Sequence, residues 1–452
     1  MLSYINVCCN YDLIVSLSRR KFVSLAGVGV GGAILAAPLK NLYANLAEGR
    51  LAFADRIGPL VPDPQGILDL PAGFKYKIIS RVGETMNDGH IVPNQHDGMA
   101  AFPGKNGQTI LVRNHEIHPL QALNNLKDDI PQYDRGCSGG TTTLIVDRDR
   151  NLTEHYLSLA GTNRNCAGGT TPWGSWISCE EETSTPYPPP GYSLEQVLPH
   201  WGKVNQKHGY NFEVPANGGL AEPIPLVAMG RFRHEAIATD PITGYIYQTE
   251  DRINSCIYRF RPDKPGNLRA GGILEALVIA SVPRIDTGID FPIGKPQPAS
   301  WVQLEDIDPE HDTLRYEAQQ KGAAIFRRGE GMCYANGELY WTATNGGAAQ
   351  VGQIFRYNLA RDTVELFVES PGVGVLDYPD NLTLAPFGDL VVCEDGREEQ
   401  FLIGITPKGR YYKLARNALN TSEFAGICFA PDGNTMFVNI YHPGMTLAVW
   451  GY

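Results

Sequence analysis

Six units of the sequence each contain a pair of residues with side chains suited to metal binding or to positioning a metal ligand. In five of the six pairs, an acidic or thiol residue is followed 14 to 17 positions later by Asn or Glu. The pairs are Asp97 with Asn114, Cys166 with Glu180, Glu235 with Glu250, Glu330 with Asn345, Asp380 with Glu394, and, with alanine in the first position, Ala425 with Asn439. Carboxylates suit calcium, and thiolates suit transition metals such as iron. Ligands that recur at one place in a repeated unit converge if the units surround a common axis.

The residues between the two members of a pair predict a β-hairpin. Residues 235–250 contain two short apolar runs around Asp240-Pro241-Ile-Thr-Gly244, and residues 330–345 contain Asn336-Gly337 at the same point. Proline presets φ for a turn and glycine accepts positive φ, while Asn-Gly is the commonest two-residue hairpin turn. Each unit is therefore expected to contribute two antiparallel strands.

Repetition of this hairpin predicts an all-β fold, a six-bladed β-propeller with loop insertions. The units average about 60 residues between Asp97 and the C-terminus, which exceeds the roughly 40 to 50 residues of a typical blade. We expect the surplus in loops at 184–191 and 297–324. Residues 73–79 alternate as an outer strand does and are expected to close the ring with the last blade.

The N-terminus has the features of a twin-arginine export signal. Ser18-Arg19-Arg20-Lys21-Phe22 precedes a Gly- and Ala-rich apolar run at 23–37 that is short for a membrane span. We expect residues 1–47 to be this signal and residues 48–452 to be a single β-propeller domain. The predicted partner is the twin-arginine translocation machinery, and the predicted location is the periplasm or the exterior. Cleavage of the leader and its retention as an anchor are both compatible with the sequence.

The overall charge argues against several classes of partner. The chain has 38 basic and 49 acidic residues, a formal net charge of −11. Nucleic acids and anionic membranes are therefore not expected to bind. An anionic substrate would need local positive charge from metal ions or from a few arginines.

Among the cysteines after the leader, Cys166 stands out because it occupies a position that holds an acid in four other units. A thiolate there would suit iron, beside carboxylates that suit calcium, although a structural role for this cysteine is an alternative. Five others lie in strand-like apolar runs and are expected to be small buried hydrophobes: Cys179, Cys256, Cys333, Cys393 and Cys428. No C-x-x-C zinc pattern is present.

Several segments together resemble the PhoX-type alkaline phosphatase family. They are 18–22 (SRRKF), 112–116 (VRNHE), 165–181 (NCAGGTTPWGSWISCEE), 208–214 (HGYNFEV), 234–236 (HEA), 249–252 (TEDR), 328–331 (RGEG) and 424–429 (FAGICF). The resemblance spans nearly the whole mature chain. It implies a periplasmic or secreted phosphomonoesterase that acts on small phosphate esters and uses Fe³⁺ and Ca²⁺.

The resemblance also implies roles for individual residues. Cys166, Glu235 and Glu330 match metal ligands of the family, and Arg328 matches its phosphate-binding arginine. Calcium ligands are expected at Glu250, Asp251 and Glu394. With Glu180 and Asp380 from the repeated pairs, these complete the predicted metal set, and Asn345 joins Arg328 as a predicted substrate-binding residue. Gly329 replaces a proline that the family often has, and Glu182-Thr183 replaces a family asparagine, so substrate preference is expected to differ.

Arg328 is the predicted catalytic residue. It lies two positions before Glu330, and residues i and i+2 of an extended segment share a face, so both are expected on the channel side with Arg327 pointing away. A guanidinium fork matches phosphate oxygens, although a rim salt bridge is the alternative. Because metal ions can supply the nucleophile, we expect no serine nucleophile and no dedicated histidine base.

Two other functions fit the repeated carboxylates. A calcium-dependent lactonase would share the axial carboxylates but would not require a thiolate or a phosphate-facing arginine. A non-enzymatic calcium-binding propeller would use the carboxylates for rigidity alone. Iron beside calcium in the purified protein would favour the phosphatase.

Overall fold

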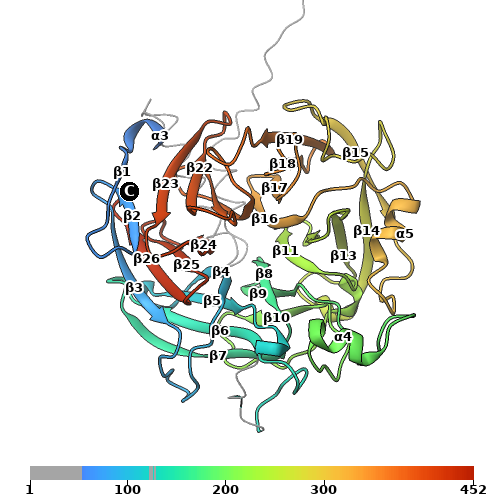
Figure 1. Cartoon of the computed structure of the whole chain (residues 1–452), viewed down its shortest axis with the longest axis horizontal. Helices are drawn as coiled ribbons and strands as arrows, with labels where there is room; N and C mark the ends of the chain where they lie inside the picture. The colour runs from blue at the N-terminus through green and yellow to red at the C-terminus, as the bar shows by residue number, and fades with distance from the viewer. Residues whose placement is uncertain (1–52, 122–125, 127–128) are drawn as a thin grey trace, which may run out of the picture.

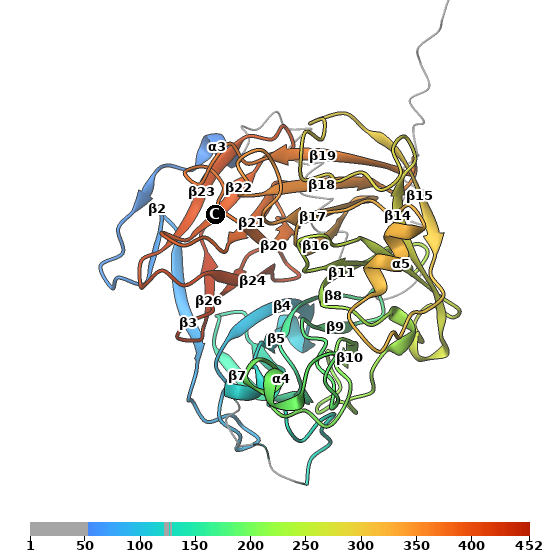
Figure 2. The ribbon, with the colours of Figure 1, turned by 45° about the vertical axis from the view of Figure 1, so that its right-hand side comes forward.

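The computed structural model describes residues 53–121, 126 and 129–452, and the predicted export signal at 1–47 lies outside the described residues. The strands are arranged around a central axis (Figure 1). Six inner strands lie nearest this axis: β4 (His96–Pro103), β8 (Asn165–Thr170), β11 (His234–Thr239), β16 (Gly329–Ala335), β20 (Pro379–Leu384) and β24 (Phe424–Phe429). Each contacts the next in chain order, and β24 contacts β4, so the inner strands form a closed ring (Figures 1 and 2).

Further strands extend outward from each inner strand. They are β5 (Thr109–His115), β6 (Gly139–Val146), β7 (Leu152–Thr162), β9 (Ser175–Glu180), β10 (Asn211–Pro215), β12 (Ile246–Glu250), β13 (Tyr258–Pro262), β14 (Gly272–Ile279), β15 (Gln297–Gln303), β17 (Glu338–Ala343), β18 (Gln353–Asn358), β19 (Thr363–Glu369), β21 (Leu390–Glu394), β22 (Phe401–Ile405), β23 (Tyr411–Asn417), β25 (Met436–Ile440) and β26 (Met445–Trp450). The N-terminal strands are β1 (Leu60–Val61), β2 (Leu68–Pro71) and β3 (Lys75–Arg81).

Helices are short and peripheral in the described part of the chain. They are α3 (Phe53–Arg56), α4 (Leu194–Trp201) and α5 (Leu314–Gln320), with 3₁₀ turns η1 (Lys105–Gly107), η2 (Pro119–Gln121), η3 (Val227–Met229) and η4 (Leu268–Ala270). None of the helices in these residues is both long enough and apolar enough to cross a membrane.

The hydrogen-bonded sheets of the described residues are four separate sheets and one of nine strands. The nine-stranded sheet arises because β15 pairs with β14 and also with β19, through Gln297–Val364 and Pro298–Thr363. The structure therefore shows an all-β, propeller-like fold, but its sheets do not number six. Residues 297–324 are only partly the predicted loop: the core at 308–312 is a loop, but β15 precedes it and α5 follows it. The pairing of β15 with β14 and β19 cannot be read from local sequence, because the partners come from distant segments.

The predicted closing strand is confirmed. Strand β3 pairs with β26 from Lys75–Trp450 to Arg81–Met445, which joins the N-terminal segment to the last sheet. The predicted hairpin turns also form, with φ of 55° at Asn336 and 85° at Gly337. Both values are those of the left-handed region that this turn type requires.

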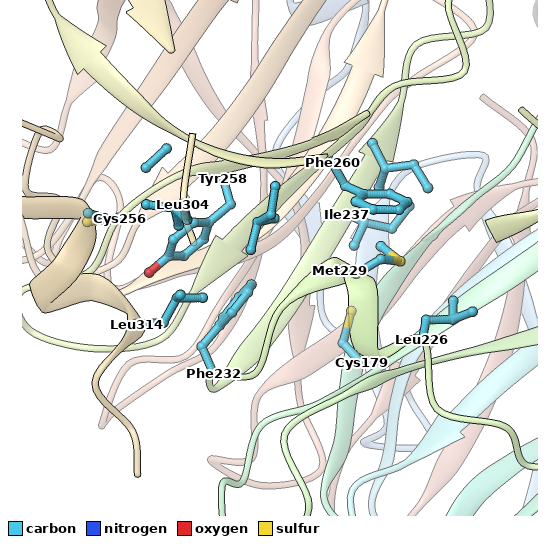
Figure 3. Close-up of a cluster of buried hydrophobic side chains, with 14 of the residues drawn as sticks. Cys179, Leu226, Met229, Phe232, Ile237, Cys256, Tyr258, Phe260, Leu304 and Leu314 are labelled. Atoms are coloured by element: carbon cyan, nitrogen blue, oxygen red, sulfur yellow. The ribbon is translucent and has the colours of Figure 1, made fainter. Parts of the chain in front are cut away.

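Apolar side chains fill the spaces between neighbouring sheets. In the cluster of Figure 3, the Phe232 and Tyr258 ring centroids lie 4.4 Å apart, and Met229 and Ile237 are buried nearby. The cysteines expected to be buried hydrophobes, such as Cys179 in this cluster, are buried, except that Cys333 is only partly covered. This packing holds the inner strands in place around the axis.

Candidate metal centre

A β-bulge occurs at the same place in all six inner strands. The pairing register shifts between His96 and Met99, Asn165 and Gly168, His234 and Ile237, Gly329 and Met332, Pro379 and Leu382, and Ala425 and Cys428. A bulge releases residues from the ladder and redirects their side chains. In four strands the residues released include a member of the predicted metal set, and in β4 they include Asp97 of the repeated pairs. We call these five the first-position residues: Asp97, Cys166, Glu235, Glu330 and Asp380.

Glu235, Glu330 and Asp380 form the closest group of carboxylates. Each offers one oxygen, and these oxygens all lie within 4.8 Å of one another. Burial raises the pKa of Glu235 well above its ordinary value, and the charges of Glu330 and Asp380 raise it further. Burial raises the pKa of Asp380 to about 7, with Asp395 adding to the shift. Mutual repulsion of this kind is what a bound cation relieves.

Cys166 lies beside this group on β8. Its Sγ is 3.4 Å from the carbonyl oxygen of His234 and 3.7 Å from that of Glu235. Burial raises the pKa of the Cys166 thiol well above its ordinary value, and the Glu235 charge contributes next. The thiol and the Glu235 carboxylate therefore share one buried environment.

Asp97 completes the first-position residues. Burial raises its pKa well above the ordinary value, followed by the charges of Glu116 and Asp380. The five residues thus come together as the repeated spacing predicted, although Asp97 and Cys166 lie outside the tight group of three.

Arg328 contacts this centre from its rim. Its Nε donates to Asp251 Oδ1 at 2.9 Å, its Nη2 to Asp251 Oδ2 at 3.2 Å, and Nη2 also to Glu330 Oε1. The expectation of an extended backbone at Arg328 was wrong, since its φ is 54°. The bend is held because Arg328 N donates to Arg252 O and Thr344 N to Arg328 O. Arg327 pairs with Asp286, as expected for a side chain directed elsewhere.

Sequence reasoning missed most of a second set of acids, which we call the outer carboxylates: Glu116, Glu181, Asp251, Asp395 and Glu423. Only Asp251 was predicted. Burial raises the pKa of Glu181 to about 8, whereas the Arg233 and Arg164 guanidiniums oppose the shift. A signal existed in the sequence, because Glu181, Asp251 and Asp395 each directly follow the second residue of a repeated pair.

Two further arginines lie among the outer carboxylates. Arg164 donates from Nε to Glu116 at 2.8 Å and pairs with Glu181 at 2.7 Å, while Arg233 pairs with Glu181 at 2.8 Å. Tyr441 donates to Glu116 Oε2 at 2.6 Å. These contacts assemble residues from four different sheet regions at one mouth of the channel.

Three predicted ligands have other partners. Glu180 accepts from Asn163 N and Gly209 N, each at 2.9 Å, and contacts His208 Nδ1 at 2.7 Å. Glu394 accepts from Asp377 N at 2.8 Å and Phe401 N at 3.1 Å. Through these bonds, Glu180 holds the backbone at 163 and 209, and Glu394 holds the backbone at 377 and 401.

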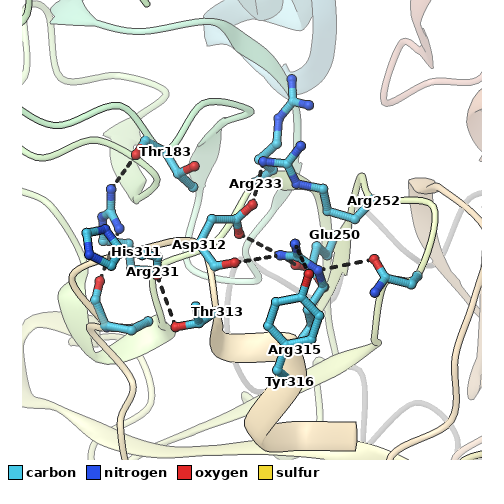
Figure 4. Close-up of polar contacts among 12 residues, drawn as sticks. Thr183, Arg231, Arg233, Glu250, Arg252, His311, Asp312, Thr313, Arg315 and Tyr316 are labelled. Atoms are coloured by element: carbon cyan, nitrogen blue, oxygen red, sulfur yellow. Dashed lines mark hydrogen bonds and ion pairs between the residues drawn. The ribbon is translucent and has the colours of Figure 1, made fainter. Parts of the chain in front are cut away.

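Glu250 is the third predicted ligand that has other partners. It accepts from Tyr258 Oη at 2.9 Å and Cys256 N at 3.1 Å, and pairs with Arg315 at 3.3 Å (Figure 4). Burial raises its pKa to about 7, opposed by the Arg315 charge. Like Glu180 and Glu394, Glu250 does not join the group of Glu235, Glu330 and Asp380.

The asparagines of the repeated pairs fasten neighbouring units together. Asn114 Nδ2 donates to Cys166 O at 3.0 Å and Ala167 O at 2.7 Å, and Asn439 Nδ2 donates to Asp97 O at 2.6 Å. Asn345 differs, because its buried Oδ1 has no hydrogen-bond partner in the structure. Its predicted role in substrate binding stays a prediction.

A cavity of about 250 Å³ continues along the axis from the bulges. The residue after each first-position residue lines it and is small: Gly98, Ala167, Ala236, Gly331, Asn381 and, in the sixth strand, Gly426. A Cβ at Gly98 would meet Ala167 Cα at 2.5 Å, and one at Gly331 would meet Asp380 O at 2.5 Å. Close approach of the inner strands therefore requires glycine at positions 98 and 331.

The histidines next to these ligands are engaged with the protein. His115 contacts Asn94 O and Thr142 Oγ1, and His234 contacts Gly230 O. Burial lowers the pKa of His234 to about 3. These contacts of both histidines are with backbone carbonyls or a threonine hydroxyl, and the absence of a histidine base stays a prediction.

The sequence profile of the alkaline phosphatase PhoX family matches residues 56–155 and 148–444. The chain belongs to the PhoX family. The enzyme class predicted from the sequence, phosphoric monoester hydrolase, is confirmed by this membership. PhoX enzymes are metal-dependent, which accords with the converging carboxylates.

The fold agrees with that of one solved PhoX structure. Pseudomonas fluorescens PhoX in complex with vanadate, a transition state analogue, is similar with a TM-score of 0.68 at 19% identity, over 89% of this chain and 98% of that one. A gluconolactonase from Xanthomonas campestris has a TM-score of 0.39 at 12% identity, over 87% and 97% of the two chains. No curated protein sequence matches this chain.

Proposed function

We propose that this PhoX-family chain releases phosphate from organic phosphate esters at a mixed iron and calcium centre on the propeller axis. The observation that carries the proposal is the convergence of Glu235, Glu330 and Asp380 within 4.8 Å, with Arg328 bonded to one of them. A basic group fixed beside a cation-binding cluster is suited to a phosphoryl group, which carries several negative oxygens.

The donor atoms fit the proposed ions. The buried carboxylates of the first-position and outer sets outnumber the guanidiniums of Arg164, Arg233 and Arg328, so bound cations would compensate the excess negative charge. Oxygen donors suit calcium, and the Cys166 thiol suits iron. The proposed ligands are Cys166, Asp97, Glu235, Asp251, Glu330 and Asp380. When bound, such ions lower the pKa of water and neutralise phosphoryl charge. Glu180, Glu250 and Glu394 are left out because their oxygens bond to residues away from the first-position residues.

Arg328 is proposed to hold the phosphoryl group. Its side chain is 31% exposed, so part of the guanidinium faces solvent while Asp251 fixes its orientation. The Glu330 charge raises the pKa of Arg328, which keeps it cationic. Because Nε and Nη2 bond to Asp251 and Glu330, Nη1 is the nitrogen that would donate to phosphate oxygens and bind the charge of the transition state.

We also propose that the fold is a six-bladed propeller. This is supported by the ring of inner strands β4, β8, β11, β16, β20 and β24 and by the bulge common to all of them. The nine-stranded sheet then corresponds to two blades, β11–β14 and β16–β19, joined by β15.

Export to the periplasm or the exterior by the twin-arginine route is proposed from residues 18–37 alone. Replacing Arg19 and Arg20 together with lysine should retain the protein in the cytoplasm, measured by cell fractionation. Continued export of the double variant would argue against this route.

The central experiment combines kinetics with metal analysis. Purified protein should hydrolyse a simple aryl phosphate and contain iron beside calcium. A protein with calcium alone that opens a lactone but leaves the phosphate ester intact would favour the lactonase. A protein with calcium and neither activity would favour the binding propeller.

A further inference from the structure

A second group of metal-type side chains lies outside the axial centre. Asp134, Cys137 and His208 each offer one ligand atom, and these atoms all lie within 4.8 Å of one another. Asp134 and Cys137 belong to the segment before β6, and His208 to the segment before β10. Their exposed fractions are 1%, 2% and 0%. Three buried groups of these types need an explanation, because none of them takes part in the proposed phosphatase centre.

The distances in this group match the edges of a metal coordination sphere. His208 Nε2 lies 3.3 Å from Asp134 Oδ2 and 3.5 Å from Cys137 Sγ. Around tetrahedral zinc, with bonds of about 2.0–2.1 Å to nitrogen, about 2.0–2.2 Å to oxygen and about 2.3 Å to sulfur, such atoms are separated by about 3.3–3.6 Å. A charge-assisted hydrogen bond from imidazolium to carboxylate would be shorter, at about 2.7–2.9 Å.

The surroundings of His208 orient its free nitrogen toward the other two groups. His208 Nδ1 contacts Glu180 Oε1 at 2.7 Å, and Glu180 itself accepts from Gly209 N at 2.9 Å. A carboxylate on the far ring nitrogen is the usual support of a metal-binding histidine, because it fixes the tautomer and the ring orientation. The carboxylate of Glu180 therefore orients His208, and this role does not require it to bind a metal on the axis.

Asp134 is held just as firmly. Oδ1 accepts from Gly136 N and from Asn205 Nδ2, each at 2.7 Å, and Oδ2 accepts from Asn205 N and from Gln206 N, the latter at 2.9 Å. A Cβ at Gly136 would meet Lys203 O at 2.4 Å, so glycine allows the two segments to approach. The Asp134 carboxylate thus accepts hydrogen bonds from its own segment, at Gly136, and from the segment before His208, at 205 and 206.

We propose that Asp134, Cys137 and His208 bind a divalent transition-metal cation, with zinc as the best-fitting ion. The mixture of thiolate, imidazole and carboxylate suits a borderline-soft cation, and a water molecule would be the fourth ligand. The site fastens two segments that are 71 residues apart between Cys137 and His208. The proposed site is independent of the chemistry on the axis.

Metal content provides the test. Full-length exported protein is purified after growth with added zinc, and zinc, iron and calcium are measured by mass spectrometry for wild type, Cys137→Ala, His208→Gln and Cys428→Ala. Cys428 is also a buried cysteine but has no metal-type neighbour in its cluster. We expect about one zinc per chain in wild type and in the control. Both site variants should lose it and keep their iron and calcium.

Cobalt replacement gives a second readout that does not depend on variant stability. Wild-type protein loaded with Co²⁺ should show a thiolate-to-cobalt charge-transfer band that Cys137→Ala lacks and Cys166→Ser keeps. Iron absorption is removed by subtracting the spectrum before loading. Wild type that takes up neither zinc nor cobalt, or that takes up the same amount as Cys137→Ala, overturns the proposal. Asp134, His208 and Glu180 would then be a hydrogen-bonded relay alone.

Discussion

Arg328 and Asp251 form a two-point contact, with Nε 2.9 Å from Oδ1 and Nη2 3.2 Å from Oδ2. Burial alone would raise the pKa of Asp251, but the Arg328 guanidinium lowers it below its ordinary value. The pair fixes the plane of the guanidinium at the mouth of the channel. Because Arg328 reaches this position from a bend with positive φ, its placement depends on the loops around it.

Arg328→Ala should lower kcat/KM on an aryl phosphate by about a hundredfold, in line with about 2.7 kcal/mol for one preorganised donor. Inhibition by inorganic phosphate should weaken in parallel. Metal content should change little, because arginine is not a ligand. Arg327→Ala is the matched control, since Arg327 pairs with Asp286 instead. An Arg328→Ala enzyme with unchanged rate and phosphate inhibition would reduce this arginine to a rim salt bridge.

Cys166→Ser should lower iron content and phosphatase rate together, because a hydroxyl is a much poorer iron ligand than a thiolate. Cys428→Ser should affect packing alone and keep both. The measurements are metal analysis and initial rates on the same preparations. Full iron content in an active Cys166→Ser protein would exclude the thiolate as a ligand.

Removal of metal should make stability depend on pH. The folded-state pKa of Asp380 is about 7, and that of Glu235 is also raised, both above their unfolded values. These groups bind protons more tightly in the folded state, so they favour folding below the unfolded pKa and this contribution is lost as pH rises through the folded value. The melting temperature of chelator-treated protein should therefore fall from about pH 4 to about pH 7.

Calcium should remove most of this pH dependence, because a cation compensates the ionised carboxylates. Asp380→Asn should make the metal-free protein less sensitive to pH, since one titrating group is absent. A metal-free melting temperature that is flat over this range, or that rises with pH, would show that the carboxylates are not the cause.

Asn114→Ala should destabilise the protein by about 2–4 kcal/mol, because several buried polar groups lose their partner. Asn114 Nδ2 donates to Cys166 O and Ala167 O, and its Oδ1 accepts from Trp176 Nε1 at 2.9 Å. Iron content should also fall, since the backbone of Cys166 is no longer fixed. Asn151→Ala, at an exposed turn, is expected to change stability by less than about 0.5 kcal/mol. Denaturant unfolding measures both, and equal small effects would contradict the proposed fastening role.

The sequence by itself determined the repeated hairpin and its chemistry. Turn residues such as Asn336 and Gly337 act over a few bonds, and the alternation of apolar residues acts over one strand, so both are visible locally. The separation of 14 to 17 residues within each pair, as from Glu235 to Glu250, is equally visible because one hairpin lies between the two members. Even the closing strand at 75–81 was foreseeable from its alternation.

Only the tertiary structure decided which of these acids meet. Glu235, Glu330 and Asp380 converge because bulges on three inner strands aim them inward, whereas the oxygens of Glu180 and Glu250 accept hydrogen bonds from Gly209 and Tyr258. Spacing alone does not distinguish these outcomes, because the side to which a side chain points depends on register and on closure of the ring. Contacts between segments far apart in the chain, such as that of Cys137 with His208, leave no local pattern at all.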